Sequence, residues 1–151
     1  EEVNNMVTKV TEYMTQKVLS VHAEKGIREA FFFMKAHKIR HLPVIDDSQQ
    51  LVGMISDREI RRPNWVDEAH DVEHIYHLDD HLLCQDVMDK RPMVLHTYDS
   101  LGKAVKLMKE HKKGALPVLD KTQQLVGILS AVDLLQALED VIDFQKNQKS
   151  A

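Results

Sequence analysis

The sequence predicts an α/β fold, of the α+β kind, in which two β-α-β-β-α units pack as an intramolecular pseudo-twofold pair. The first observation is an internal repeat: the segment near residue 43 returns near residue 117, always 74 residues later. The second is that short apolar runs alternate with helical stripes in both copies. This period exceeds that of solenoid repeats, which favours two duplicated small domains. The clearest matches are Leu42-Pro43-Val44 with Leu116-Pro117-Val118 and Leu51-Val52-Gly53 with Leu125-Val126-Gly127.

Each copy divides into the same order of elements. Residues 18–21 and 94–96 are short and apolar or β-branched, which favours strands. Apolar residues then recur at helical spacing, and Ser100 or Asp99 can cap the second of these helices. Residues 41–45, 51–55 and 125–129 have the pattern of buried strands, and Ser56 and Ser130 open short helices. The helical stripes are Ile27, Ala30, Phe31 and Met34 in the first copy and Leu101, Ala104, Val105 and Met108 in the second.

Composition narrows the class of protein. Of the 151 residues, 43% are hydrophobic, as in an ordinary globular protein, and the formal net charge of −4 indicates no broad basic surface for nucleic acid. Cys84 is the one cysteine, so no disulfide can form within the chain. No apolar run approaches the roughly 18 residues of a membrane span, and the first residues lack the pattern of a secretion signal. We therefore expect a cytoplasmic protein with no membrane or nucleic-acid partner.

The expected domain plan has five parts. Residues 1–12 form a helical lead-in, 13–62 the first unit, 63–86 a histidine-rich linker helix, 87–140 the second unit, and 141–151 a polar tail that frays at its end. Phe32 stands where the second copy has Lys106, on the outer side of the apolar stripe. It is either a solitary surface aromatic or a contact with a second subunit.

A Gly-x-x-Ser-x-x-acid motif closes each copy at the expected junction of strand and helix. One interpretation is an ordinary capping box, in which the serine and the acid close the helix N-terminus. The other is a ligand site. The unpaired amides of a helix N-terminus and the hydroxyl suit a phosphate, the acid can accept hydrogen bonds from two sugar hydroxyls, and the glycine lets a ligand approach the backbone. The residues are Gly53, Ser56 and Glu59 in the first copy and Gly127, Ser130 and Asp133 in the second.

The ordered set of motifs, present twice, resembles tandem CBS domains (the Bateman module), which sense adenosine nucleotides. The matching parts are Tyr13-Met14-Thr15, Arg40-His41-Leu42-Pro43-Val44 and residues 53–59, each with its second-copy equivalent. The compact layout is most like the stand-alone acetoin-utilisation type. The resemblance implies two related clefts between the sheets of the two units. Such clefts bind AMP, ADP or ATP and, in some members, NAD-type ligands or S-adenosylmethionine.

The resemblance also implies roles for individual residues. Asp133 and Glu59 correspond to the acid that holds the ribose, and Ser130 and Ser56 to the hydroxyl that contacts the sugar-phosphate part. Residues just before the Leu-Pro-Val strand reach the phosphates or the base, and apolar neighbours flank the adenine. The full implied set is Thr15, Val18, Leu19, Arg40, His41, Pro43, Ser56, Arg58, Glu59, Met93, Val94, Gly114, Ala115, Pro117, Ser130 and Asp133.

Departures from the family pattern predict that the two clefts are unequal. Glu59 is one methylene longer than the expected Asp, and Asp89 replaces a Thr where a phosphate would come. The second copy has no cation at the two positions before its Leu-Pro-Val strand, Gly114 and Ala115. We therefore favour ribose capture by Ser130 and Asp133. The phosphate charge would be met by Arg40, His41 or Arg58.

A histidine stripe in the middle segment supports a rival hypothesis. The spacing of 4, 3 and 4 residues would align the histidines on one helix face, where two of them and a carboxylate could bind zinc or nickel. They could instead titrate as a pH sensor, or lie on a solvated or subunit-facing helix. The spacing lacks the H-E-x-x-H signature, and Cys84 fits a small buried residue better than a nucleophile. The stripe comprises His70, His74, His77 and His81.

Three functions follow from these observations. The main hypothesis is a regulatory adenosine-ligand module that needs no cofactor and is not an enzyme, because no nucleophile–base–orienter set emerges from the residues. Ligand binding would shift its conformation or association, and the resemblance implies a homodimer formed through the helices, with Phe32 at the seam. The second is a scaffold that has lost ligand binding and only dimerises. The third is a metal-dependent enzyme or metal sensor that uses the histidine stripe.

Overall fold

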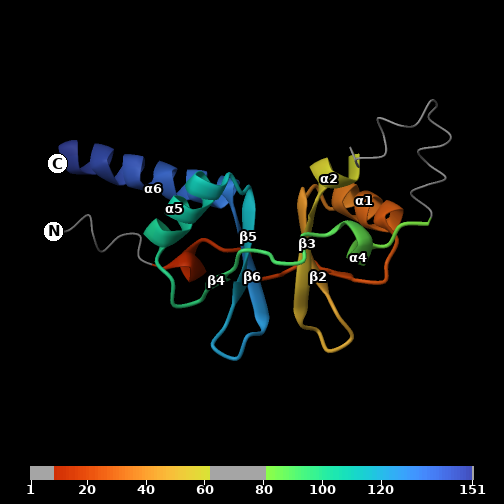
Figure 1. The fold of residues 1–151 in the computed structure, drawn as a ribbon. Helices are drawn as coiled ribbons and strands as arrows, with labels where there is room; N and C mark the ends of the chain where they lie inside the picture. The colour runs from red at the N-terminus through yellow and green to blue at the C-terminus, as the bar shows by residue number, and fades with distance from the viewer. Residues whose placement is uncertain (1–8, 62–80, 151) are drawn as a thin grey trace. The chain divides into compact units, whose positions relative to one another are not determined.

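The computed structural model describes residues 9–61 and 81–150 and shows the predicted order of elements twice (Figure 1). The predicted α/β fold is confirmed, although both opening strands are shorter than expected. The first copy contains β1 (Val21–His22), α1 (Ile27–Ala36), β2 (His41–Ile45), β3 (Leu51–Ser56) and α2 (Asp57–Arg61). The second contains β4 (Leu95–His96), α5 (Leu101–His111), β5 (Ala115–Leu119), β6 (Leu125–Ser130) and α6 (Ala131–Lys149). A short 3-10 helix, Val10–Glu12, and the helix α4, Cys84–Val87, precede the two copies.

Each copy builds one three-stranded sheet with the same topology. The first strand runs parallel to the second, and the second runs antiparallel to the third, in the orders β1-β2-β3 and β4-β5-β6. The register is also repeated, because Leu42 faces Ile55 in one sheet and Leu116 faces Leu129 in the other. All four of these side chains are buried. The period-2 pattern thus places the two equivalent strand pairs against their helices in the same way.

The compact units differ from the sequence repeats in one respect. Unit 1 consists of residues 9–18 with 93–150, and unit 2 consists of residues 19–61 with 81–92. In unit 1, Thr15 and Ile128 exchange backbone hydrogen bonds of 2.9 and 3.1 Å. In unit 2, Asp89 and Met54 exchange equivalent bonds of 2.9 and 3.1 Å. Each sheet therefore gains a short bridge from the segment that leads into the other repeat.

Each unit has its own hydrophobic core beneath its sheet. In unit 1 the buried face of α5 packs with β5, β6 and Val10 of the leading segment. In unit 2 the buried face of α1 packs with β2, β3 and Cys84 of α4. The helical stripes read from the sequence supply these faces, since Ala30, Met34, Ala104 and Met108 are all buried.

The structure describes only parts of the three less regular segments. The tail expected to fray after residue 145 is helical, since α6 continues to Lys149. The Ser130 cap and the buried Ala137 anchor the first turns of α6, and the residues beyond, 138–149, include no glycine or proline to break the helix. In the lead-in, the described part forms a single 3-10 turn at Val10–Glu12. The expected linker helix falls mostly on residues 62–80, outside the described part of the chain.

Two side chains lie as the sequence predicts. Phe32 is 49% exposed on the outer face of α1. Cys84 is fully buried, and its burial raises the pKa of its thiol to about 11, which makes it a packing residue and not a ready nucleophile. Within residues 9–61 and 81–150 no helix has both the length and the apolar character needed to cross a membrane.

Candidate ligand site

The strand-to-helix junction of unit 1 forms a complete capping box between Ser130 and Asp133. The Ser130 N–H donates to Asp133 Oδ2 at 2.8 Å, and the Asp133 N–H donates to Ser130 Oγ at 3.3 Å. Asp133 Oδ1 accepts no hydrogen bond in the described chain. The capping interpretation is therefore correct, yet one carboxylate oxygen and the Ser130 hydroxyl hydrogen remain available to a ligand.

The N-terminus of α6 has fewer free backbone amides for binding a phosphate than the sequence suggested. The Ala131 N–H donates to the Gly114 carbonyl at 2.9 Å, and the Asp133 N–H is engaged in the cap. The same bond occurs in unit 2, where the Asp57 N–H donates to the Arg40 carbonyl at 2.9 Å. Most of the backbone amides expected to bind an anion already donate hydrogen bonds within the protein. The carbonyl of the residue before the Leu-Pro-Val strand accepts the N–H of the first helical residue.

The motif glycines do not open the backbone to a ligand. A β-carbon on Gly127 would collide with the Met14 side chain, and one on Gly53 would collide with the Met88 side chain and lie 2.9 Å from the Asp89 carbonyl oxygen. The expected close ligand approach at these glycines is therefore wrong. Each glycine instead makes room for the segment that bridges to its sheet.

Unit 2 presents the same box with different surroundings. The Ser56 N–H donates to Glu59 Oε2 at 3.1 Å, and the Glu59 N–H donates to Ser56 Oγ at 3.3 Å. His41 faces Ser56 across β2 and β3. Burial lowers the pKa of His41 from its usual 6.5, although the Asp57 and Glu59 carboxylates oppose this change. At neutral pH a lowered pKa favours the neutral imidazole, which argues against the phosphate-binding cation that the sequence allowed.

The structure divides the implied ligand residues between the two units. The pairing of β5 with β6 sets Ala115 against Ser130, and the bridge at Ile128 places Thr15 alongside the same strand. Arg58 and Glu59 are exposed at the start of α2, and Arg40 is exposed just before β2. Unit 1 holds Thr15, Val18, Met93, Val94, Gly114, Ala115, Pro117, Ser130 and Asp133, whereas unit 2 holds Leu19, Arg40, His41, Pro43, Ser56, Arg58 and Glu59. Both prolines are fully buried.

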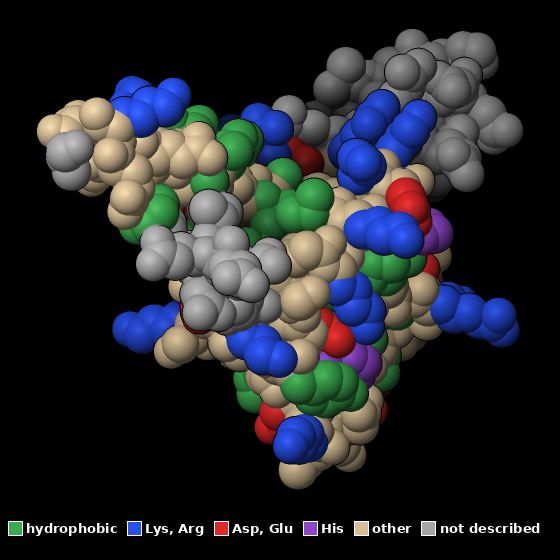
Figure 2. Space-filling model, turned by 90° about the vertical axis from the view of Figure 1, so that its left-hand side faces the viewer, with side chains coloured by type: hydrophobic (Ala, Val, Ile, Leu, Met, Phe, Trp, Pro, Cys, Tyr) green, Lys and Arg blue, Asp and Glu red, His purple; other side chains and the backbone are tan. Residues whose placement is uncertain are grey.

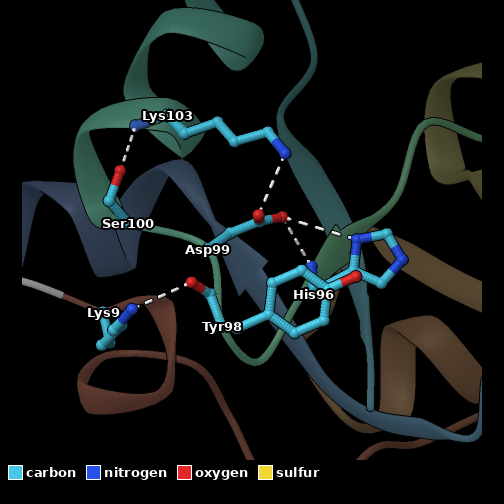
Figure 3. A network of polar contacts seen from close by, with 6 residues as sticks. All are labelled: Lys9, His96, Tyr98, Asp99, Ser100 and Lys103. Atoms are coloured by element: carbon cyan, nitrogen blue, oxygen red, sulfur yellow. Dashed lines mark hydrogen bonds and ion pairs between the residues drawn. The ribbon is translucent and has the colours of Figure 1, made fainter. Parts of the chain in front are cut away.

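Sequence reasoning missed a buried polar network in unit 1 (Figure 3). Asp99 is only 6% exposed. It accepts the His96 N–H at 2.8 Å and the Lys103 ammonium at 3.0 Å, while Ser100 caps α5 by accepting the Lys103 N–H at 3.1 Å. Tyr98 stacks on the His96 ring, and Lys9 donates to the Tyr98 carbonyl. The network fixes the turn between β4 and α5.

The repeat carries the same pair in unit 2 with its charges exchanged. Lys25 and Glu29 stand at the positions equivalent to Asp99 and Lys103, and their charged atoms lie 3.6 Å apart on the surface. Asp99 and Lys103 are closer, at 3.0 Å, and Asp99 is buried. The pair in unit 1 is therefore structural, whereas the exposed pair in unit 2 contributes little.

The described residues offer no cluster of metal ligands that would support the metal hypothesis. His70, His74 and His77 lie outside residues 9–61 and 81–150, and His81 is exposed. Within those ranges no group of three or more His, Cys, Asp or Glu residues is placed to hold a metal ion.

A comparison with protein-family models places the chain in a family. The model of the CBS domain matches residues 10–63 and 84–140, so the chain belongs to the CBS domain family. It is 28% identical over 137 residues to a CBS domain-containing protein of Dictyostelium discoideum, covering 89% of this chain and 93% of that protein. It is 27% identical over 139 residues to a homoserine O-acetyltransferase of Methanosphaera stadtmanae. That match covers 91% of this chain but only 26% of the enzyme, and it concerns the CBS part alone.

Solved structures share the fold. The chain is 26% identical to CBSX2 in complex with AMP, with a TM-score of 0.75 over 88% of this chain and 97% of that chain. A CBS domain pair in complex with 5′-methylthioadenosine and S-adenosyl-L-methionine has a TM-score of 0.74 at 20% identity, over 89% of this chain and 98% of that one. This second likeness shows the fold alone.

Proposed function

We propose that this chain is a regulatory module, without catalytic activity of its own, that binds an adenosine ligand of the AMP, ADP or ATP type. The main support for this proposal is that Asp133 Oδ1 and the Ser130 hydroxyl hydrogen make no hydrogen bond within the capping box. The AMP complex of CBSX2, 26% identical to this chain, supports the ligand class. Binding changes the conformation or the association of the chain.

The ribose binds at the junction of β6 and α6. A sugar hydroxyl donates to Asp133 Oδ1, and the Ser130 hydroxyl donates to a sugar or phosphate oxygen, since its own oxygen already accepts the Asp133 N–H. Thr15 lies alongside β6 through its bridge to Ile128. The half-buried Met93 and Val94 offer apolar contacts to the adenine. NAD-type ligands and S-adenosylmethionine remain alternatives that share the same ribose.

Isothermal titration calorimetry with AMP, ADP, ATP, NADH and S-adenosylmethionine tests this function. Asp133→Asn is the sharpest variant, because the amide oxygen can still accept the Ser130 N–H while the ribose loses a charged acceptor. We expect it to weaken AMP binding about tenfold or more. Glu59→Gln, the same change in unit 2, is the matched control and should alter AMP binding less. Absence of binding by all five ligands would contradict the proposal, as would full AMP affinity in Asp133→Asn.

A second candidate function, that of a dimerising scaffold, is favoured by the apolar surface of unit 1. Val105 of α5 and Leu135, Leu138 and Ile142 of α6 are each 43–62% exposed. A shallow groove of about 280 Å³ runs between these helices, and hydrophobic side chains gather at the surface in the upper part of Figure 2. We propose that a second copy covers this face.

Light scattering coupled to size-exclusion chromatography tests the dimer. Leu135→Lys with Leu138→Lys places charges on the proposed contact and should yield a monomer, whereas Gln136→Lys with Glu139→Lys adds lysines to the same helix as a control. A dimer that survives the leucine substitutions would exclude this face. If the chain dimerises but binds none of the five ligands, the scaffold function replaces the sensor.

A further inference from the structure

In unit 1 the leading segment, residues 9–18, is joined to α6 by a hydrogen bond between two side chains. The Tyr13 hydroxyl donates to Asp140 Oδ2 at 2.6 Å, and Gln136 Nε2 donates to Asp140 Oδ1 at 3.1 Å. These bonds hold the pKa of Asp140 below its usual 3.8, and the bond to Asp140 raises the pKa of Tyr13 to about 12. At neutral pH a protonated phenol therefore donates to an ionised carboxylate, which is a short and strong class of hydrogen bond.

Tyr13 lies on a short stretch of backbone that is fixed on both sides. Val10 is fully buried, and its N–H donates to the Asp99 carbonyl at 3.1 Å. The Tyr13 N–H donates to the Val10 carbonyl at 3.2 Å. Thr15, close behind Tyr13 in the chain, exchanges backbone hydrogen bonds with Ile128 of β6. The position of the phenol is therefore linked to the positions of Thr15 and β6.

Asp140 lies on the same face of α6 as the proposed ribose acceptor. Asp133, Ala137 and Asp140 follow the i, i+4, i+7 spacing that places residues on one side of a helix. Ala137 is only 5% exposed and the two aspartates are half-buried, so this side faces the protein. Two helical turns, about 10 Å along the axis, separate the two carboxylates. Asp140 can therefore influence the ribose acceptor only through the helix.

The packing of α6 against α5 leaves the rotation of α6 weakly fixed. The two helices meet across the shallow groove of about 280 Å³. Its lining includes Gly102 of α5 and Ala137 of α6, whose side chains are too small to interlock. On the other side of α6, Val132 and Leu135 are 71% and 62% exposed. The Tyr13–Asp140 hydrogen bond supplies a directed contact that this packing lacks.

The second repeat shows which part of Tyr13 the fold does not require. Val87 stands at the equivalent position in unit 2 and packs against the core of that unit, as Tyr13 packs against the core of unit 1. Valine supplies the apolar contact but has no hydroxyl to donate. Apolar packing at this position is thus common to both units. The hydroxyl is present only in unit 1, the unit that contains Ser130 and Asp133.

We propose that Tyr13 and Asp140 are positioning residues of the adenosine-ligand site in unit 1. Their hydrogen bond ties α6 to the segment that contains Thr15, and it holds Asp133 Oδ1 and the Ser130 hydroxyl in one orientation before the ligand binds. Groups that are already ordered bind a ligand more tightly, because they lose less conformational entropy on binding. This inference rests on the proposed function, since it adds two residues to the ribose site at the start of α6.

Isothermal titration calorimetry with AMP tests the pair, and each substitution has a matched control. Tyr13→Phe keeps the ring and removes the hydroxyl, and Tyr98→Phe makes the same change at an exposed tyrosine of unit 1. Asp140→Ala removes the acceptor, and Asp143→Ala makes the same change at an exposed acid of α6. We expect Tyr13→Phe and Asp140→Ala each to weaken AMP binding about fivefold, whereas the controls should stay within about twofold of wild type.

Two further variants separate positioning from an effect on general stability. The double variant Tyr13→Phe/Asp140→Ala should bind AMP no more weakly than either single variant, because both substitutions remove one shared contact. Asp140→Asn should retain part of the affinity, because its amide oxygen can still accept the Tyr13 hydroxyl. Losses that add in the double variant would overturn the proposal, since they would show that the two side chains act separately.

Urea denaturation of the same variants completes the test. Loss of the hydrogen bond should also lower the free energy of unfolding, but lower stability alone leaves the dissociation constant of the folded chain unchanged. Tyr13→Phe with reduced stability and wild-type AMP affinity would therefore overturn the positioning role and leave the proposed function intact. A wild-type chain that binds none of AMP, ADP, ATP, NADH and S-adenosylmethionine would instead contradict the proposed function, and this inference with it.

Discussion

The thioether of Met14 packs over Gly127 and occupies the space that a β-carbon on Gly127 would need. Met88 covers Gly53 in the same way, with the Asp89 carbonyl oxygen beside it. In each unit the methionine belongs to the segment that leads into the other repeat, and the next residue bridges to β6 or β3. The glycine of the Leu-Val-Gly motif is thus required by packing within each unit.

This packing predicts that Gly127→Ala and Gly53→Ala both lower the free energy of unfolding, by about 1–3 kcal/mol each. The contacts at Gly127 are all made by the flexible Met14 side chain, so adding Met14→Ala should recover part of the loss. Adding Met88→Ala to Gly53→Ala should recover less, because the Asp89 backbone also obstructs the new methyl group. Urea denaturation measures all four variants.

Gly102→Ala serves as the control for these substitutions. Gly102 lies in α5, and the nearest atom to an added β-carbon is Ser100 Oγ at 3.9 Å. Alanine there should raise the free energy of unfolding by about 1 kcal/mol, because it favours the helix. Equal tolerance of alanine at Gly127, Gly53 and Gly102 would contradict the packing role of the methionines.

Asp99 should contribute more to the free energy of unfolding than Lys25, the residue at the equivalent position in unit 2. Asp99→Asn removes a buried charged acceptor and should cost about 2 kcal/mol, whereas Lys25→Gln, at the equivalent exposed position, should cost under about 0.5 kcal/mol. Burial alone would raise the pKa of Asp99, but the hydrogen bonds from Lys103 and the His96 N–H outweigh it and hold that pKa below its usual 3.8.

The pH dependence of Asp99 follows from that lowered pKa. A carboxyl with a lower pKa in the folded state contributes its stability fully above its unfolded pKa and loses it as the pH falls through the folded one. The difference between the wild-type chain and Asp99→Asn in urea denaturation should therefore be constant near neutrality and shrink below about pH 4. A difference that grows on acidification would show that the carboxylate is not stabilised by Lys103.

His41 should titrate below the usual range for histidine. Its burial disfavours the imidazolium, so the pKa lies below 6.5 in the folded chain. The unfolded chain then binds more protons, and the stability that the neutral ring contributes is complete above 6.5 and is lost as the pH falls through the folded value. Titration of the imidazole C–H signals by NMR measures this directly. A midpoint at or above 6.5 would restore His41 as a candidate phosphate-binding cation.

Tyr13 should ionise at a higher pH than an ordinary tyrosine. Its hydroxyl donates to Asp140 Oδ2 at 2.6 Å, and this hydrogen bond, with burial and the nearby charge, raises its pKa to about 12. The contact stabilises the fold below the ordinary pKa of 10 and is lost as the pH rises through 12. Phenolate absorbance should show a late step that is missing in Tyr13→Phe and earlier in Asp140→Asn. A late step that persists in Tyr13→Phe would assign it elsewhere.

The repeat and its hydrophobic stripes were enough to predict the order of elements. Identical spacing forces identical registers, as the Leu42–Ile55 and Leu116–Leu129 pairs show. The capping boxes at Ser56 and Ser130 were also visible, because serine and acid three residues apart have few other roles at a helix start.

The sequence could not predict which sheet receives each leading segment. Met14 and Met88 occupy equivalent repeat positions, and either could have packed on its own copy. The choice depends on tertiary contacts such as Thr15 with Ile128, which no local pattern specifies.

Ribose binding at the Ser130–Asp133 capping box is tested most directly by the NMR amide spectrum of the isotope-labelled chain during titration with AMP. Ribose capture at the cap predicts saturable shifts of the Ser130 and Asp133 amide signals, since both N–H groups are bonded within the box that the ligand contacts. The signals of Ser56 and Glu59, in the equivalent box of unit 2, should move less. Unchanged Ser130 and Asp133 signals under saturating AMP would show that an adenosine ligand does not bind there.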